Sequence, residues 1–213
     1  MGDNVENTTK YSNFSHFSRE TINNLAIYEE LLLETNKKLN LIARSTEKTI
    51  WNRHFLDSIQ IIDFIDKKCT ICADLGSGAG FPGLVLAIAA KERKMMTKFV
   101  LYEKSKKKSN FLNVVSKKLN LNTKIISENI FNQKKIEADI VVSRAFKPID
   151  KILQLIHEKS ENFKNLLLFL GKNGKQTLID ASKVWELEYK EEKSITSDDS
   201  LIVNIKKIKK KID

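Results

Sequence analysis

Cysteine and histidine are scarce in this chain: its 213 residues include two cysteines and three histidines. The cysteines form a single C-x-x-C pair, Cys69-Thr-Ile-Cys72, which cannot complete a zinc site alone. None of His16, His54 and His157 stands at a ligand spacing from it. Because Cys72 falls in or beside an apolar run, we expect both cysteines to be small buried core residues that bind no metal. We also expect a reduced, cytoplasmic protein.

Long apolar runs and arginine are scarce as well. No run reaches the roughly 18 apolar residues of a membrane-spanning helix, and the polar N-terminus is unlike a signal peptide, so no membrane association is expected. Basic residues nevertheless dominate, with 37 Lys and Arg against 27 Asp and Glu and a formal net charge of +10. This excess favours a polyanionic partner such as nucleic acid, while the shortage of arginine leaves a lysine-rich proteome as the alternative source of the charge.

Glycine is the third scarce residue, and its distribution is informative. Four of only seven glycines fall in one stretch, Asp74-Leu-Gly-Ser-Gly-Ala-Gly-Phe-Pro-Gly83. The apolar run at 71–73 predicts a buried strand that enters this loop, and the run at 84–90 predicts the helix that follows it. Glycines let a ligand approach the backbone, and a helix N-terminus offers unpaired N–H groups, so the stretch predicts a nucleotide-type site.

The loop fits two templates. Gly78-Ala-Gly80-Phe-Pro-Gly83 matches the G-x-G-x-x-G pattern of dinucleotide sites, with Glu103 at a suitable distance for the ribose. Asp74 with the glycines at 76, 78 and 80 instead matches the Asp-x-Gly-x-Gly-x-Gly loop of class I S-adenosylmethionine methyltransferases. A carboxylate repels a pyrophosphate, whereas it attracts an ammonium or sulfonium group, so Asp74 favours S-adenosylmethionine over a nicotinamide dinucleotide.

Strands and helices alternate along the rest of the chain, after a helical start. Residues 18–66 show helical spacing with a break at 36–41. Residues 1–17 are expected to be frayed, and the lysines of 206–211 are expected to form a solvated end of the chain. The expected strands are 71–75, 99–103, 124–127, 139–144, 165–170, 184–189 and 201–205. This pattern predicts an α/β fold, a Rossmann-like methyltransferase with a mostly parallel seven-stranded sheet that ends in an antiparallel hairpin. We expect an N-terminal helical cap, 1–68, and a methyltransferase domain, 69–213.

In open α/β sheets, ligands bind beyond the carboxyl ends of the strands. That rule gathers the candidate cofactor residues around one crevice: Asp74, Gly76, Ser77, Gly78, Gly80, Phe81, Glu103, Asn129, Ile130 and Arg144. Glu103 can accept hydrogen bonds from both ribose hydroxyls. The lysines of 104–108 open a helix, where the macrodipole disfavours cations, so they indicate either a phosphate contact or a solvated face.

The segment after the fourth expected strand limits the reaction. Ser143-Arg-Ala-Phe146 stands where amine methyltransferases carry an Asp/Asn-Pro-Pro-Tyr type loop, and no cysteine is placed for carbon-5 methylation. A target with a free lone pair remains, and guanine N7 fits because it needs no general base. Arg144 could hold the base or its phosphate, or pair with a carboxylate; Phe146 could stack on the base, or belong to the core.

These residues together resemble the RsmG (GidB) family of bacterial 16S ribosomal RNA guanine-N7 methyltransferases. The similarity covers most of the chain in register, and its motifs are Asn40-Leu-Ile-Ala, Arg53-His-Phe-Leu-Asp-Ser58, the loop 74–83 with its Pro-Gly ending, Glu103 with Lys107, and Ser143-Arg-Ala-Phe146. The chain departs from the family pattern at Ser127-Glu-Asn-Ile-Phe131, where Arg is common after the serine, and at Ser197-Asp-Asp-Ser200.

The resemblance implies S-adenosylmethionine as donor and guanine 527, in the 530 loop of 16S rRNA, as target. It implies cofactor contacts at Gly76, Phe81, Asn129-Ile130 and Arg144, of which Arg144 is our catalytic candidate. Our candidates for RNA contacts are Arg53, His54, Lys107 and Phe146, and the expected partner is 16S rRNA or the 30S subunit, bound by a monomer. Two other functions stay open, a small-molecule methyltransferase and a non-catalytic RNA-binding assembly protein.

Overall fold

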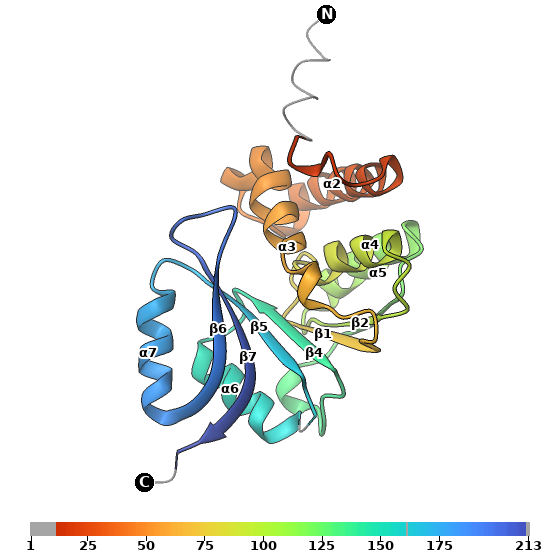
Figure 1. Ribbon diagram of the computed structural model, residues 1–213. Coiled ribbons are helices and arrows are strands. Elements are labelled where there is room, and N and C mark those ends of the chain that lie inside the picture. Colours follow the sequence, from red (N-terminus) through yellow and green to blue (C-terminus); the bar gives the residue numbers. More distant parts are fainter. Residues whose placement is uncertain (1–11, 161, 212–213) are drawn as a thin grey trace, which may run out of the picture.

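One seven-stranded sheet organises the protein, whose computed structural model describes residues 12–160 and 162–211. The strand order is β3-β2-β1-β4-β5-β7-β6 (Figure 1). The strands are β1 Ile71–Leu75, β2 Lys98–Tyr102, β3 Thr123–Ile126, β4 Ile140–Arg144, β5 Asn165–Leu170, β6 Trp185–Lys193 and β7 Leu201–Lys210. The first five are parallel, and β7 is antiparallel to β5 and β6. The expected fold class is confirmed.

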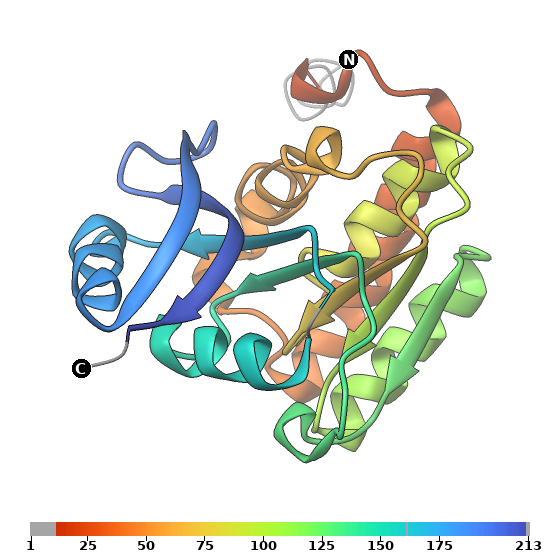
Figure 2. The ribbon, with the colours of Figure 1, turned by 60° about the horizontal axis from the view of Figure 1, so that its bottom comes forward.

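Helices cover both faces of the sheet (Figures 1 and 2). Helices α4 (Gly83–Glu92) and α5 (Lys106–Lys118) pack on one face, and α6 (Ile149–Lys159) and α7 (Gly174–Val184) on the other. The central strands are buried on both sides, which explains why they are continuous apolar runs without alternation. Because β1 to β5 are parallel, their carboxyl ends meet at one edge of the sheet.

The N-terminal segment is helical but irregular. Helix α2 (Arg19–Leu39) begins at Ser18, whose hydroxyl accepts the N–H of Thr21 at 3.2 Å, and ends at Asn40, whose φ is 39°. Short turns follow: η2 Arg44–Thr49, the π-helical η3 Trp51–Leu56, α3 Asp57–Ile59 and η4 Ile62–Phe64. This segment and the helices α4 and α5 bury their side chains in one common core. The division of the chain at residue 68 stays a prediction.

Both ends of the chain differ from expectation. Within 12–17, the 3-10 turn η1 (Ser12–Phe14) buries Phe14 edge-on against Trp51, with ring centroids 5.1 Å apart, so the expectation of a frayed end is wrong there. Residues 1–11 lie outside the described part. The lysine-rich end is not a loose tail, because β7 pairs with β6 as far as Lys210. The backbone completes the ladder while the lysine side chains stay in solvent.

None of the described helices is long and apolar enough to cross a membrane.

Candidate active site

The glycine loop turns sharply between β1 and α4. Gly76 and Gly80 have φ values of 71° and 103°, which favour glycine. A side chain at Gly76 would also collide with the ring of Phe146, which packs directly on this glycine. The N–H groups of Gly76 and Ser77 both donate to the Tyr102 carbonyl, at 2.9 and 3.1 Å. The loop is thus fixed to the end of β2.

A cavity of about 470 Å³ lies against this loop, and we call it the first cavity. Six of the predicted site residues line it: Gly76, Gly78, Glu103, Asn129, Ile130 and Phe146. Residues that the sequence did not single out also line it, among them Tyr102, Phe131, Lys147 and Lys151. Lys147 and Lys151 could have been found from their position in the sequence, because they follow β4 at the carboxyl edge of the sheet.

Glu103 is held in place by the backbone around it. It is buried, and its two carboxylate oxygens accept the N–H groups of Gly78 at 3.0 Å and of Ser105 at 2.8 Å. Each oxygen keeps a second lone pair for a ligand hydroxyl. Glu103 can therefore bind a ribose without leaving its backbone partners.

Asp74 lies under the loop and does not line the first cavity. One carboxyl oxygen accepts the N–H of Gly83 at 3.0 Å, at the start of α4; the other is buried without a hydrogen-bond partner among the described residues. Burial raises the pKa of Asp74 to about 7. A buried, half-satisfied carboxyl group stabilises a positive charge nearby, so its chemistry fits a cationic ligand better than a pyrophosphate.

Ser77 and Gly80 complete the underside of the loop. The Ser77 hydroxyl donates to the Asp74 carbonyl at 3.2 Å. Gly80 packs against Tyr28 of α2 and Leu84, and the Tyr28 hydroxyl donates to the Ala79 carbonyl. Ser77 and Gly80 thus shape the loop from below and do not line the first cavity.

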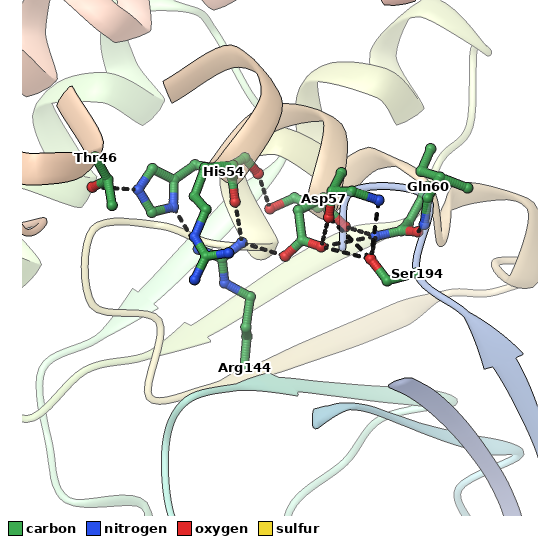
Figure 3. Close-up of polar contacts among 10 residues, drawn as sticks. Thr46, His54, Asp57, Gln60, Arg144 and Ser194 are labelled. Atoms are coloured by element: carbon green, nitrogen blue, oxygen red, sulfur yellow. Dashed lines mark hydrogen bonds and ion pairs between the residues drawn. The ribbon is translucent and has the colours of Figure 1, made fainter. Parts of the chain in front are cut away.

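Arg144, at the end of β4, forms a separate polar cluster with the N-terminal segment (Figure 3). Its guanidinium donates to Asp57 at 2.8 Å, to the Arg53 carbonyl at 3.3 Å and to His54 Nδ1 at 2.6 Å. The other oxygen of Asp57 accepts hydrogen bonds from Gln60, Ser194 and Thr196, at 2.9, 3.3 and 2.7 Å. We call Thr46, His54, Asp57, Gln60, Arg144, Ser194 and Thr196 the Arg144 cluster.

His54 carries no charge in this cluster at neutral pH. Burial, followed by the charges of Arg144 and Arg53, lowers its pKa to about 3. Because the guanidinium must donate to Nδ1, the ring hydrogen sits on Nε2 and is donated to the Thr46 hydroxyl at 3.0 Å. The ring stacks on Phe81 with centroids 4.8 Å apart, and the Arg144 guanidinium lies 5.4 Å from the same ring.

The structure therefore does not bring all the predicted residues together on the first cavity. Arg144, Phe81 and His54 lie together in and beside the Arg144 cluster and do not line the first cavity. Of the alternatives left open for Arg144, the carboxylate pair is present, and Asp57 is the partner that sequence reasoning missed. Lys107 is exposed on α5 and lies off the cavity, whereas Lys104 and Lys108 line it.

The Arg53 side chain is exposed. Among the described residues, no group of three or more His, Cys, Asp or Glu could hold a metal ion.

A solved structure shares this fold at low sequence identity. TYW2 of M. jannaschii, in complex with AdoMet, matches with a TM-score of 0.54 and 17% identity over 76% of this chain and 78% of that chain. The fold is that of the class I S-adenosylmethionine methyltransferases.

Sequence comparison identifies the family. The family described as GidB, rRNA small subunit methyltransferase G, matches residues 21–203. The "Ribosomal RNA small subunit methyltransferase G" of Pelagibacter ubique is 44% identical over 195 residues, 91% of this chain and 92% of that protein. The protein of the same name from Rickettsia felis is 37% identical over 192 residues, 90% of this chain and 96% of that protein. The chain belongs to the rRNA small subunit methyltransferase G family, which confirms the resemblance.

Proposed function

We propose that this protein transfers the methyl group of S-adenosylmethionine to N7 of guanine 527 in the 530 loop of 16S rRNA. The observation that carries the proposal is the first cavity, where the glycine loop and Glu103 share one space with lysines 104, 108, 147 and 151. A cofactor site whose rim is rich in cations suits a polyanionic substrate. The family of the chain supports ribosomal RNA as that substrate.

The residues present fit S-adenosylmethionine. Glu103 offers free lone pairs to the ribose hydroxyls, and the backbone of Gly76 and Gly78 is open to a ligand in the first cavity. Asn129 and Ile130 line the same cavity after β3. The orphaned oxygen of Asp74 supplies negative charge beneath the loop, which favours the positive charges of this cofactor.

The bound cofactor supplies a methyl group on a positively charged sulfur, open to direct attack by a lone pair. No described side chain on the first cavity is a cysteine or histidine, and both cysteines are buried with raised pKa values. A thiolate nucleophile is thus not provided. Guanine N7 is unprotonated at neutral pH and needs no general base, so the task of the chain is to hold two reactants in position.

The lysines on the rim give the RNA-binding surface of the proposal. Lys108 lies in the first turn of α5 and Lys104 just before its N-cap, Ser105. Lys151 lies in the first turn of α6 and Lys147 just before its N-cap, Pro148. Lys107, the residue predicted from sequence, is exposed on the same turn of α5 and extends this surface. Phosphates beside the target nucleotide can be neutralised here while the base is presented to the cofactor.

Tritium transfer tests the proposal. Labelled S-adenosylmethionine is incubated with the protein and with 30S subunits from a strain that lacks the modification, in parallel with free 16S rRNA, and the labelled base is mapped. Label on N7 of guanine 527 is the expected result. Label on another base, or no transfer although the cofactor binds, would contradict it and favour a small-molecule or non-catalytic role.

A further inference from the structure

We propose that a second cavity, beside the first, receives the target guanine base after it has swung out of the RNA. This inference rests on the proposed function and names where its substrate binds. The second cavity has a volume of about 350 Å³ and lies at the carboxyl ends of β4 and β5, between the starts of α6 and α7. Residues Ala145, Phe146 and Lys147 line both cavities.

The shared residues bring the two cavities into the relation that methyl transfer needs. Phe146 packs directly on Gly76 of the cofactor loop and stacks on Phe131, with ring centroids 6.1 Å apart. Phe146 also borders the second cavity. A base held in the second cavity can therefore contact the same Phe146 ring that packs on the cofactor loop.

The lining of the second cavity suits a flat aromatic base. Its floor is apolar and includes the buried side chains of Ile149, Ile152 and Leu168. Phe146 and Phe169 add aromatic rings, which can stack on a base. Pockets that receive an extruded base combine such stacking with hydrogen bonds to the edge of the base.

Asn173 is the group that can read the edge of the base. It occupies the N-cap position of α7, where asparagine commonly caps the helix, but its side chain makes no capping hydrogen bond. The free amide offers a donor and an acceptor, the combination that a purine edge requires. Lys147 and Lys172 border the same cavity and can neutralise the phosphates of the extruded nucleotide.

Gly171 permits a direct test. It lines the second cavity, and a Cβ at this position would meet no heavy atom within 4 Å, so a larger side chain fits without a clash. Gly171→Phe should place a ring in the mouth of the cavity and lower kcat on rRNA on the order of 100-fold, with unchanged affinity for S-adenosylhomocysteine. Met96→Phe, at an 85% exposed position that lines neither cavity, controls for an added aromatic ring and should keep full activity. Asn173→Ala should also lower kcat while the folded signal is kept.

A second measurement separates this inference from the proposed function. An RNA fragment carries 2-aminopurine in place of the target guanine, and its fluorescence is followed on addition of protein with S-adenosylhomocysteine. The wild type should change the signal, and Gly171→Phe should abolish the change. Normal methylation and fluorescence in Gly171→Phe would overturn the base pocket and leave the proposed function intact. Methylation of a different base by the wild type would overturn the proposed function, and the fluorescence would still decide whether a base enters.

Discussion

Acid should destabilise this protein through His54. The ring is buried, stacks on Phe81 and accepts a hydrogen bond from Arg144, so its protonation would place two cations in contact. The pKa of His54 is lowered from 6.5 to about 3 in the folded protein. In the unfolded chain the ring titrates at its ordinary value, so the two states bind protons at different pH.

The sign follows from proton linkage. Between pH 6.5 and about 3 the unfolded state holds a proton on His54 that the folded state does not, so the free energy of unfolding falls as the pH falls. Above pH 6.5 neither state holds this proton, so the free energy of unfolding no longer changes with pH through His54. Each pKa unit corresponds to about 1.4 kcal/mol, so lowering the pH from 7 to 4 should cost about 3 kcal/mol through this residue.

The comparison of wild type with His54→Gln isolates this contribution. Glutamine keeps an acceptor for Arg144 but cannot titrate, while every other group titrates in both proteins. Guanidinium unfolding at pH 7, 5 and 4 gives the free energy for each. The variant should be the less stable protein at pH 7, since it loses the stacking on Phe81, and the gap should shrink by about 3 kcal/mol at pH 4. A gap that stays constant with pH would refute the reasoning.

Four further outcomes are expected. Gly83→Ala should lower the free energy of unfolding by about 1–3 kcal/mol, because the new Cβ would lie 2.6 Å from a carboxyl oxygen of Asp74; chemical denaturation measures it. Affinity for S-adenosylmethionine, measured by calorimetry, should rise with pH through about 7 as Asp74 loses its proton, and Asp74→Asn should remove this rise and bind weakly without unfolding. Lys104→Gln with Lys108→Gln should weaken RNA binding and reduce the slope of log affinity against log salt by about 2, while cofactor affinity stays constant. Arg144→Ala should lower turnover far more than cofactor affinity, and equal losses of the two would make it a cofactor residue. It should also cost about 1.5–3 kcal/mol of stability, because the half-buried Asp57 carboxylate loses its charged hydrogen-bond donor.

The strands and the glycine loop were predictable because their signals are local. The apolar run at 71–73 and the glycines that follow Asp74 specify a strand and a tight turn without reference to the rest of the chain. Glu103 lies on the first cavity beside the glycine loop, because the carboxyl ends of neighbouring parallel strands must meet at one edge; its role there stays a prediction.

The direction of Arg144 was not predictable in this way. The sequence places it at the end of β4, where it could turn to either face of the sheet. Its orientation is set by Asp57, 87 residues earlier, whose carboxylate is fixed by a π-helical turn and by hydroxyl groups of the β6–β7 loop. Similarly, the lysine-rich end has the composition of a solvated tail, and only pairing with β6 makes it a strand.

The Arg144 cluster connects parts of the chain that do not meet in sequence. Through one carboxylate, Asp57 joins the end of β4 to the loop between β6 and β7, and Gln60 reinforces this by accepting the N–H of Ile195 at 2.9 Å. The β4 end continues directly into Ala145–Lys147, the stretch that lines both cavities. The N-terminal segment therefore holds Arg144, the residue just before this stretch, directly, and the C-terminal hairpin acts on Arg144 through Asp57. Both parts of the chain act on the candidate site from outside it.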